Sequence, residues 1–259
     1  MTNIIKLDSH RVSFAHQPIV RMRDNKVVAH ELLLREFNQL KMQDFCQEPA
    51  LFVEHMSFLV RGLAKQIREM VIEGKLRTVF VNFSPEQICH PQFPEALESF
   101  YEQGLHPSSV VIEVTENDLP KDVSGFYHNV KHARNNGHPI VCDDFGAGIS
   151  NFRHVMKMKP GIIKTDMTLV REAAESVDDE KSLRALVNCF HDIGVKVVVE
   201  GIETAEHLSL AQRVGGDFGQ GYYFGRPEAR VDNFVFEPIA NAQAPVRNLE
   251  SLLKLTGVG

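Results

Sequence analysis

Eight short runs of apolar and β-branched residues, separated by segments with helical periodicity, restrict most strongly how this chain can fold. Several runs are apolar at nearly every position, as in the stretch from Val195 to Val199. Continuous apolarity is typical of strands that are buried on both faces, as in a parallel sheet covered by helices. The expected strands are residues 12–20, 27–34, 78–83, 110–115, 139–144, 161–164, 195–200 and 216–222.

Amphipathic helical patterns occupy the segments between these runs. Apolar stripes at residues 123–133 and 183–193 end at Gly137 and Gly194, which are typical helix stops. A longer stripe over residues 52–70 predicts one long helix before the third strand.

Strands that alternate with helices favour a closed (β/α)8 barrel of the TIM type, and the 259 residues are close to the typical length. Only residues 21–26 separate the first two strands, which is too short for a helical crossover. We therefore expect an α/β fold, a TIM-like barrel whose first strand is antiparallel. The expected organisation is one domain over residues 1–259, with a core at about 12–235, a C-terminal packing segment at 236–259 and no sensor domain.

Composition narrows the function classes. Hydrophobic residues make up 43% and charged residues 24%, as in an ordinary globular protein without an apolar run of membrane-spanning length or a signal peptide. A net charge of −6 without blocks of like charge argues against binding to DNA, RNA or a membrane. The four cysteines are widely spaced, which predicts reduced thiols and a cytoplasmic location; they are Cys46, Cys89, Cys142 and Cys189.

Polar or charged side chains follow the apolar run of six of the expected strands. The carboxyl ends of parallel barrel strands open on one face, where barrel enzymes keep their active sites. A single acid in such a place is usually a solvated loop residue or a helix N-cap, but six in register predict a shared mouth. These residues are Glu31, Asn82, Glu113, Asp143 with Asp144, Lys164 with Asp166, and Glu200.

The acids of this group predict a metal site. Crowded carboxylates repel one another, and a cation relieves that repulsion. Oxygen ligands without a matching His or Cys cluster select hard ions such as Mg²⁺ or Mn²⁺. Two such ions can stabilise both the attacking and the leaving oxygen at a phosphate, so the residues alone predict a metal-dependent phosphoester hydrolase.

The same residues occur in an ordered series of motifs between Phe14 and Pro227. The motifs are F-A-H-Q-P-I-V (14–20), H-E-L-L-L-R (30–35), V-N-F-S (81–84), E-V-T-E (113–116), D-D-F-G-A-G (143–148), K-T-D (164–166), E-G-I-E-T (200–204), Q-G-Y (220–222) and R-P (226–227). As an ordered set they resemble the EAL-domain family of cyclic di-GMP phosphodiesterases.

The resemblance implies roles for the acids and their neighbours. One metal ion would be held by Glu31, Asn82, Glu113 and Asp143. The second would be held by Asp143 and Asp144, with Glu200 as ligand or general base. In catalysis, Lys164 would bind the attacking water, Gln220 would orient it, and Glu203 and Asp166 would support the site.

The resemblance also implies substrate and loop residues. Gln17, Leu34 and Arg35 would contact cyclic di-GMP, although Arg35 could instead pair with an acid such as Glu36. A loop that couples dimerisation to metal binding in the family would include Glu116, Gly146 and Gly148, although the two glycines could serve only a tight turn. A homodimer and a regulatory protein partner follow as expectations.

Three departures from the family pattern qualify this reading. Leu32 replaces the alanine of E-A-L, Ile149 stands where the family usually has tyrosine, and residues 37–50 differ from the usual segment. That segment could reshape the substrate rim or form a partner surface.

The expected activity is metal-dependent hydrolysis of cyclic di-GMP to linear pGpG. The alternatives are an inactive receptor or interaction module of the same family, and a different metal-dependent barrel phosphodiesterase.

Overall fold

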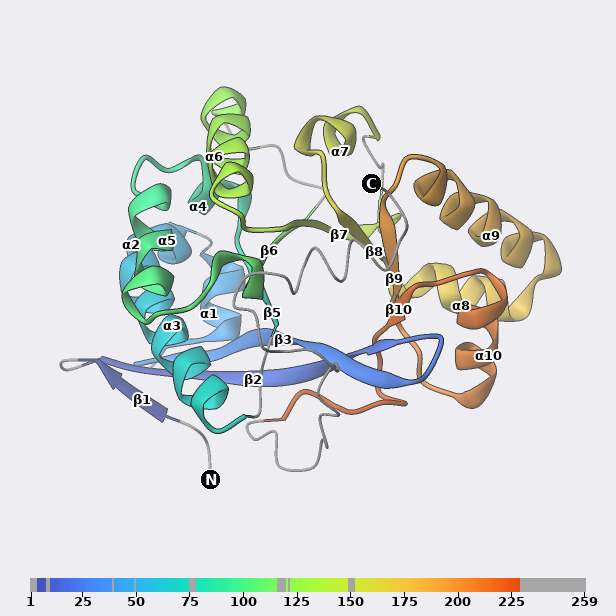
Figure 1. Cartoon of the computed structure of the whole chain (residues 1–259), viewed down its shortest axis with the longest axis horizontal. Helices are drawn as coiled ribbons and strands as arrows, with labels where there is room; N and C mark the ends of the chain where they lie inside the picture. Colours follow the sequence, from blue (N-terminus) through green and yellow to red (C-terminus); the bar gives the residue numbers. More distant parts are fainter. Residues whose placement is uncertain are drawn as a thin grey trace.

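A closed ring of eight hydrogen-bonded strands forms the centre of the molecule (Figure 1). Strand β2 pairs antiparallel with β3 and with β10, whereas the other neighbours in the ring run parallel. The prediction of a TIM-like barrel with an antiparallel first strand is therefore confirmed. The ring strands are β2 (His10–Arg21), β3 (Lys26–Phe37), β5 (Val79–Asn82), β6 (Val110–Thr115), β7 (Ile140–Phe145), β8 (Ile162–Thr165), β9 (Lys196–Val199) and β10 (Phe218–Gly219).

This computed structural model describes residues 4–7, 10–38, 40–48, 50–74, 78–115, 120, 122–148 and 152–228. The expected C-terminal packing segment at 236–259 lies outside the described residues, as do Glu116 and Ile149.

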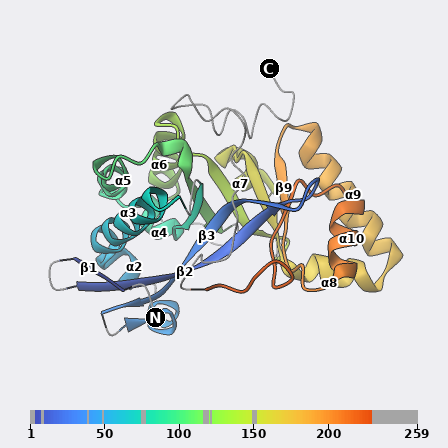
Figure 2. The same ribbon diagram turned by 60° about the horizontal axis from the view of Figure 1, so that its bottom comes forward.

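The helices lie outside the barrel, with α3 to α6 on one side and α8 to α10 on the other (Figure 2). No helix in the described ranges is long and apolar enough to cross a membrane. The helices are α1 (Met42–Gln47), α2 (Ala50–Glu54), α3 (Met56–Ile72), α4 (Pro85–Cys89), α5 (Phe93–Glu102), α6 (Val123–Asn135), α7 (Phe152–Met158), α8 (Met167–Glu175), α9 (Val177–Asp192) and α10 (Ala205–Arg213), with a 3₁₀ turn at Pro107–Ser109.

Three features differ from the sequence prediction. The expected helix over residues 52–70 is interrupted at His55, where a turn separates α2 from α3. Two short strands, β1 (Ile4–Leu7) and β4 (Leu40–Lys41), extend the sheet beyond the ring by pairing with β2 and β3. Both are too short for their periodicity to be recognised in the sequence.

The barrel interior is filled by one apolar residue from each of the eight ring strands. This interior layer forms a core of its own, distinct from the larger core between the strands and the helices. Because side chains alternate along a strand, all of its members point into the barrel. The interior layer consists of Ile19, Ala29, Phe80, Val111, Val141, Ile162, Val198 and Phe218.

A buried imidazole on β2 gives the fold a predictable sensitivity to acid. His16 lies 2.9 Å from Gln66 Nε2 on α3, and burial lowers its pKa to about 4. As the pH falls from about 6.5 towards 4, the unfolded chain binds a proton that the folded chain does not. The free energy of unfolding should therefore decrease over this range, by roughly 3 kcal/mol from this group. Measured by urea denaturation, the free energy of unfolding should decrease less with falling pH in His16→Gln than in the wild type.

The difference in stability between the wild type and His16→Gln separates the effect of His16 from that of other groups that titrate in the same range. His128 is exposed on α6, and His128→Gln should leave the pH dependence unchanged. Parallel stability profiles for wild type and His16→Gln would contradict this account.

Candidate active site

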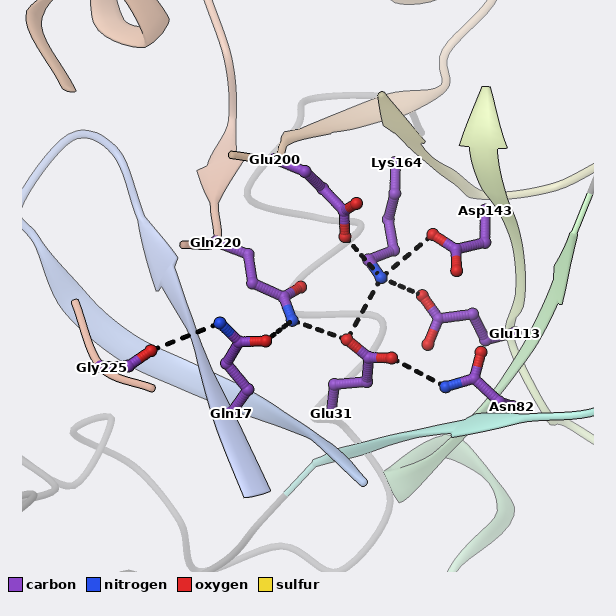
Figure 3. A network of polar contacts seen from close by, with 9 residues as sticks. All are labelled: Gln17, Glu31, Asn82, Glu113, Asp143, Lys164, Glu200, Gln220 and Gly225. Carbon is purple, nitrogen blue, oxygen red and sulfur yellow. Dashed lines mark hydrogen bonds and ion pairs between the residues drawn. The ribbon is translucent and has the colours of Figure 1, made fainter. Parts of the chain in front are cut away.

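Eight polar side chains form a ring that lies one layer above the apolar interior layer (Figure 3). Each is two residues along its strand from a member of the interior layer, towards the carboxyl ends of the parallel strands. With a side-chain period of two, each therefore also points into the barrel. The polar ring consists of Gln17, Glu31, Asn82, Glu113, Asp143, Lys164, Glu200 and Gln220.

The structure shows how far along their strands these residues lie. Glu31, Glu113, Asp143 and Lys164 are inside β3, β6, β7 and β8, within the strand ranges expected from the sequence. Of the predicted group, Asn82 ends its strand, and Asp166 and Glu200 each follow one directly. The strands run on past the acids, so the carboxylates lie within the barrel, where water screens their charges less.

The ammonium of Lys164 lies at the centre of the ring and is 1% exposed. Its Nζ is 2.6 Å from Glu113 Oε1 and 2.6 Å from Glu200 Oε1. It is also 3.0 Å from Asp143 Oδ1 and 3.3 Å from Glu31 Oε2. Burial alone lowers the pKa of Lys164, but these four carboxylates outweigh burial and raise it well above its usual value. Lys164 is therefore a buried cation at neutral pH.

One lysine does not compensate all of the acids around it. Burial raises the pKa of Glu200 to about 8 and that of Asp144 to about 6, and it raises the pKa of Glu113 well above the usual value. Glu31 differs because the Lys164 charge and hydrogen bonds from Gln220 (2.6 Å) and Asn82 (2.7 Å) outweigh burial and lower its pKa. The site thus holds more negative charge than its own cation can balance.

A β-bulge allows two consecutive acids to reach the site. Between β7 and β8 the register shifts at Asp143 and Asp144, and Asp144 has a left-handed φ of 55°. A bulge interrupts the alternation that would otherwise send neighbouring side chains to opposite faces. Oxygen atoms of Asp143, Asp144 and Glu200 consequently lie within 4.8 Å of one another.

This donor set fits hard divalent cations. Five carboxylates and one ammonium leave four negative charges, which two divalent ions would balance. Oε2 of Glu113 is buried and has no hydrogen-bond or ion-pair partner in the described part of the chain. A buried oxygen without a partner is costly, and a metal ion would satisfy it.

A cavity of about 790 Å³ opens beside the ring. Glu31, Asn82, Asp143 and Asp144 line its polar end, and the expected substrate residues Leu34 and Arg35 also line it. Its remaining wall is mainly apolar and includes Met42 and Phe45 of α1, Phe52 of α2, Leu59 and Leu63 of α3, and Phe83. The atypical segment at 37–50 therefore contributes to the wall of this cavity.

Gln17 lies in the ring and also holds the chain after β10. Its Oε1 accepts a hydrogen bond of 3.2 Å from Gln220 Nε2, and its Nε2 donates one of 3.3 Å to the carbonyl of Gly225. The segment that follows Gln220 is thereby fixed over the mouth of the barrel.

The remaining predicted residues lie around the ring. Asp166 is the N-cap of α8 and accepts a hydrogen bond of 2.8 Å from Thr168 N. Gly146 has a φ of 99°, and a Cβ there would approach Leu169 Cδ1 to 2.7 Å, so a tight turn alone accounts for this glycine. Gly148 is exposed. Glu203 is partly exposed and pairs with Arg171 at 3.0 Å, outside the polar ring.

Removal of the central cation should destabilise the metal-free protein strongly. In EDTA at neutral pH, Lys164→Met should lower the free energy of unfolding by about 3–5 kcal/mol, because four carboxylates lose their buried partner. Urea denaturation measures this loss. Lys181 forms an exposed pair with Asp178, and Lys181→Met should change stability by less than about 1 kcal/mol. Equal, small effects of the two substitutions would show that Lys164 does not hold the ring together.

Comparison with known proteins agrees with this fold. The chain is 26% identical over 237 residues to the cyclic di-GMP phosphodiesterase PdeF of Escherichia coli, covering 86% of this chain and 31% of PdeF. It is 24% identical over 230 residues to the bifunctional diguanylate cyclase/cyclic di-GMP phosphodiesterase MucR of Pseudomonas aeruginosa, covering 85% of this chain and 34% of MucR. The chain thus spans about a third of the length of these two relatives.

Among solved structures, BlrP1 of Klebsiella pneumoniae, in a manganese and cyclic di-GMP complex, superposes with a TM-score of 0.74 at 29% identity. That match covers 88% of this chain and 58% of the BlrP1 chain. The profile of the EAL domain matches residues 5–227. Since this match includes every strand of the barrel and every member of the polar ring, the chain belongs to the EAL domain family.

Proposed function

We propose that this chain hydrolyses one phosphodiester bond of cyclic di-GMP to give linear pGpG, with two Mg²⁺ or Mn²⁺ ions. The observation that carries this proposal is the polar ring, in which every acid needed for two ions surrounds a buried lysine. Relatives that have lost these acids would lack the excess negative charge that favours metal binding.

The ring residues divide into two ligand sets. Glu31, Asn82, Glu113 and Asp143 would hold one ion, and Asp143, Asp144 and Glu200 would hold the other. When bound, such ions polarise the phosphate and lower the pKa of a water molecule.

The chain's own groups would position the reactants. Gln220 donates both of its described side-chain hydrogen bonds through Nε2, and its buried Oε1 has no partner in the described ranges. That oxygen is therefore free to accept a hydrogen bond from the attacking water. Lys164 would hold the carboxylates in place and stabilise added negative charge. Glu200 lies 2.6 Å from the Lys164 ammonium and would serve as a metal ligand or as the general base.

The cavity beside the ring suits a dinucleotide. Arg35 is exposed at the cavity, where its guanidinium could bind a phosphate oxygen through two hydrogen bonds. The apolar wall formed by Leu34 and the side chains of α1 to α3 would contact a base. Membership of the family supports a role in bacterial second-messenger signalling that governs biofilm formation and motility. It also supports a cytoplasmic location, a homodimer and a regulatory protein partner as parts of this proposal.

Turnover should depend on the metal and on the ring. We expect purified protein to convert cyclic di-GMP to pGpG with Mg²⁺ or Mn²⁺, and not with EDTA, as followed by chromatography. Glu31→Gln should lower the rate by roughly a hundredfold or more, because it removes a charged ligand without a change in side-chain size. Glu172 is an exposed acid on α8, and Glu172→Gln should retain full activity.

If the chain binds cyclic di-GMP but forms no product, it is a receptor of the same family and not an enzyme. Full activity of a folded Glu31→Gln protein would contradict the site assignment itself.

A further inference from the structure

A second hollow lies at the opposite end of the barrel from the polar ring. It has a volume of about 290 Å³ and is lined where β7, β8, β9 and β10 begin, together with the turns that follow α6 and α7. Barrel enzymes place catalysis at the other face, so this hollow is separate from the candidate active site. We refer to it as the foot hollow.

The walls of the foot hollow are mainly apolar. Pro139, Ile140, Ile162 and Phe218 line it, and the last two belong to the interior layer. Lys164 and Gln220 are two residues further along the same two strands and belong to the polar ring. The foot hollow therefore adjoins the interior layer, which lies directly beneath the polar ring.

Its charged groups are all basic. Arg134, Lys159 and Lys196 line the foot hollow, and no acid among the described residues does, although the chain carries a net charge of −6. Lys159 is exposed and has no carboxylate partner in the described part of the chain, whereas Lys196 pairs with Asp217 at 2.7 Å. Arg134 donates one hydrogen bond of 2.9 Å, from Nη1 to the carbonyl of Met158. Its remaining N–H donors are available to a ligand.

A buried polar group also lines the foot hollow. His138 is 1% exposed, and its Nδ1 lies 2.9 Å from the carbonyl of Val110. Within the described ranges its Nε2 has no hydrogen-bond partner. A buried nitrogen without a partner is costly, and a polar group of a ligand would satisfy it.

We propose that the foot hollow binds a small organic phosphate whose flat apolar body lies against Ile140, Ile162 and Phe218. The phosphate would be held by Arg134 and Lys159, since a guanidinium can bind a phosphate through paired hydrogen bonds. The volume is near the lower limit of about 300 Å³ for small-molecule pockets, which suits one ring system and excludes a dinucleotide.

The same cations have a simpler possible role. Helices α6 and α7 end beside Arg134 and Lys159, and cations near a helix C-terminus stabilise the helix dipole. In that case, substitution of Lys159 would change the stability of the protein and would leave its affinity for a ligand unchanged.

Naphthyl phosphate is a suitable probe, titrated by calorimetry into the full chain in EDTA and low salt. We expect one site with a dissociation constant below about 1 mM and much weaker binding of inorganic phosphate. Gly161→Phe should abolish binding, because Gly161 lines the foot hollow, a Cβ there meets no atom within 4 Å, and the added ring would compete with the ligand for this space. Lys159→Asn should weaken binding roughly tenfold. Asparagine also tolerates the left-handed φ of 51° at Lys159.

Lys157→Asn provides the matched control, since Lys157 is exposed on α7 and lies over the Tyr127 ring, outside the foot hollow. It should leave the affinity unchanged. Absence of binding by the wild type, or equal binding by Gly161→Phe, would overturn the proposal. A Lys159→Asn protein that is less stable but binds normally would do the same. Because EDTA removes metal ions, the outcome is independent of whether the chain hydrolyses cyclic di-GMP.

Discussion

The contact between the Lys164 ammonium and four carboxylates is the interaction on which the active site depends. Buried acids at this density repel one another, and each loses its hydration. Lys164 offsets part of that cost from the centre, at 2.6 to 3.3 Å from the nearest oxygens. The charge that remains would favour divalent cations at this site. Burial, together with the charges of the neighbouring acids, raises the pKa values of Glu113 and Glu200.

The barrel makes this concentration of charge possible. Eight strands each contribute one apolar residue to the interior layer and, two residues further on, one polar residue to the ring. The apolar layer closes the barrel beneath the ring and keeps water from the lower side of the site. The bulge at Asp143 and Asp144 interrupts this pattern between β7 and β8, and it adds a fifth carboxylate. A left-handed residue costs about 1–3 kcal/mol, which is consistent with a functional reason for it.

Much of this architecture could be predicted from the sequence because it rests on local patterns. Short apolar and β-branched runs between helical patterns identified all eight ring strands, and the short link between the first two identified the antiparallel strand. Glu113 follows Val111 by two residues, and Glu200 follows Val198 by two. This spacing can be read from the sequence and indicates that the acids face the barrel interior. The bulge could not be predicted, since it depends on register with β8. Contacts such as Gln220 with Glu31, 189 residues apart, follow from barrel closure alone. The foot hollow combines side chains from separate turns between Arg134 and Phe218, so no motif marks it.

The most direct test of the account is anomalous diffraction from a crystal of the protein grown with Mn²⁺. The account predicts two manganese peaks within the barrel mouth. One should be bounded by Glu31, Asn82, Glu113 and Asp143, and the other by Asp143, Asp144 and Glu200. A barrel mouth without manganese at saturating concentration, with Lys164 still paired to all four carboxylates, would contradict it. The ring would then be a neutralised structural cluster and not a metal site.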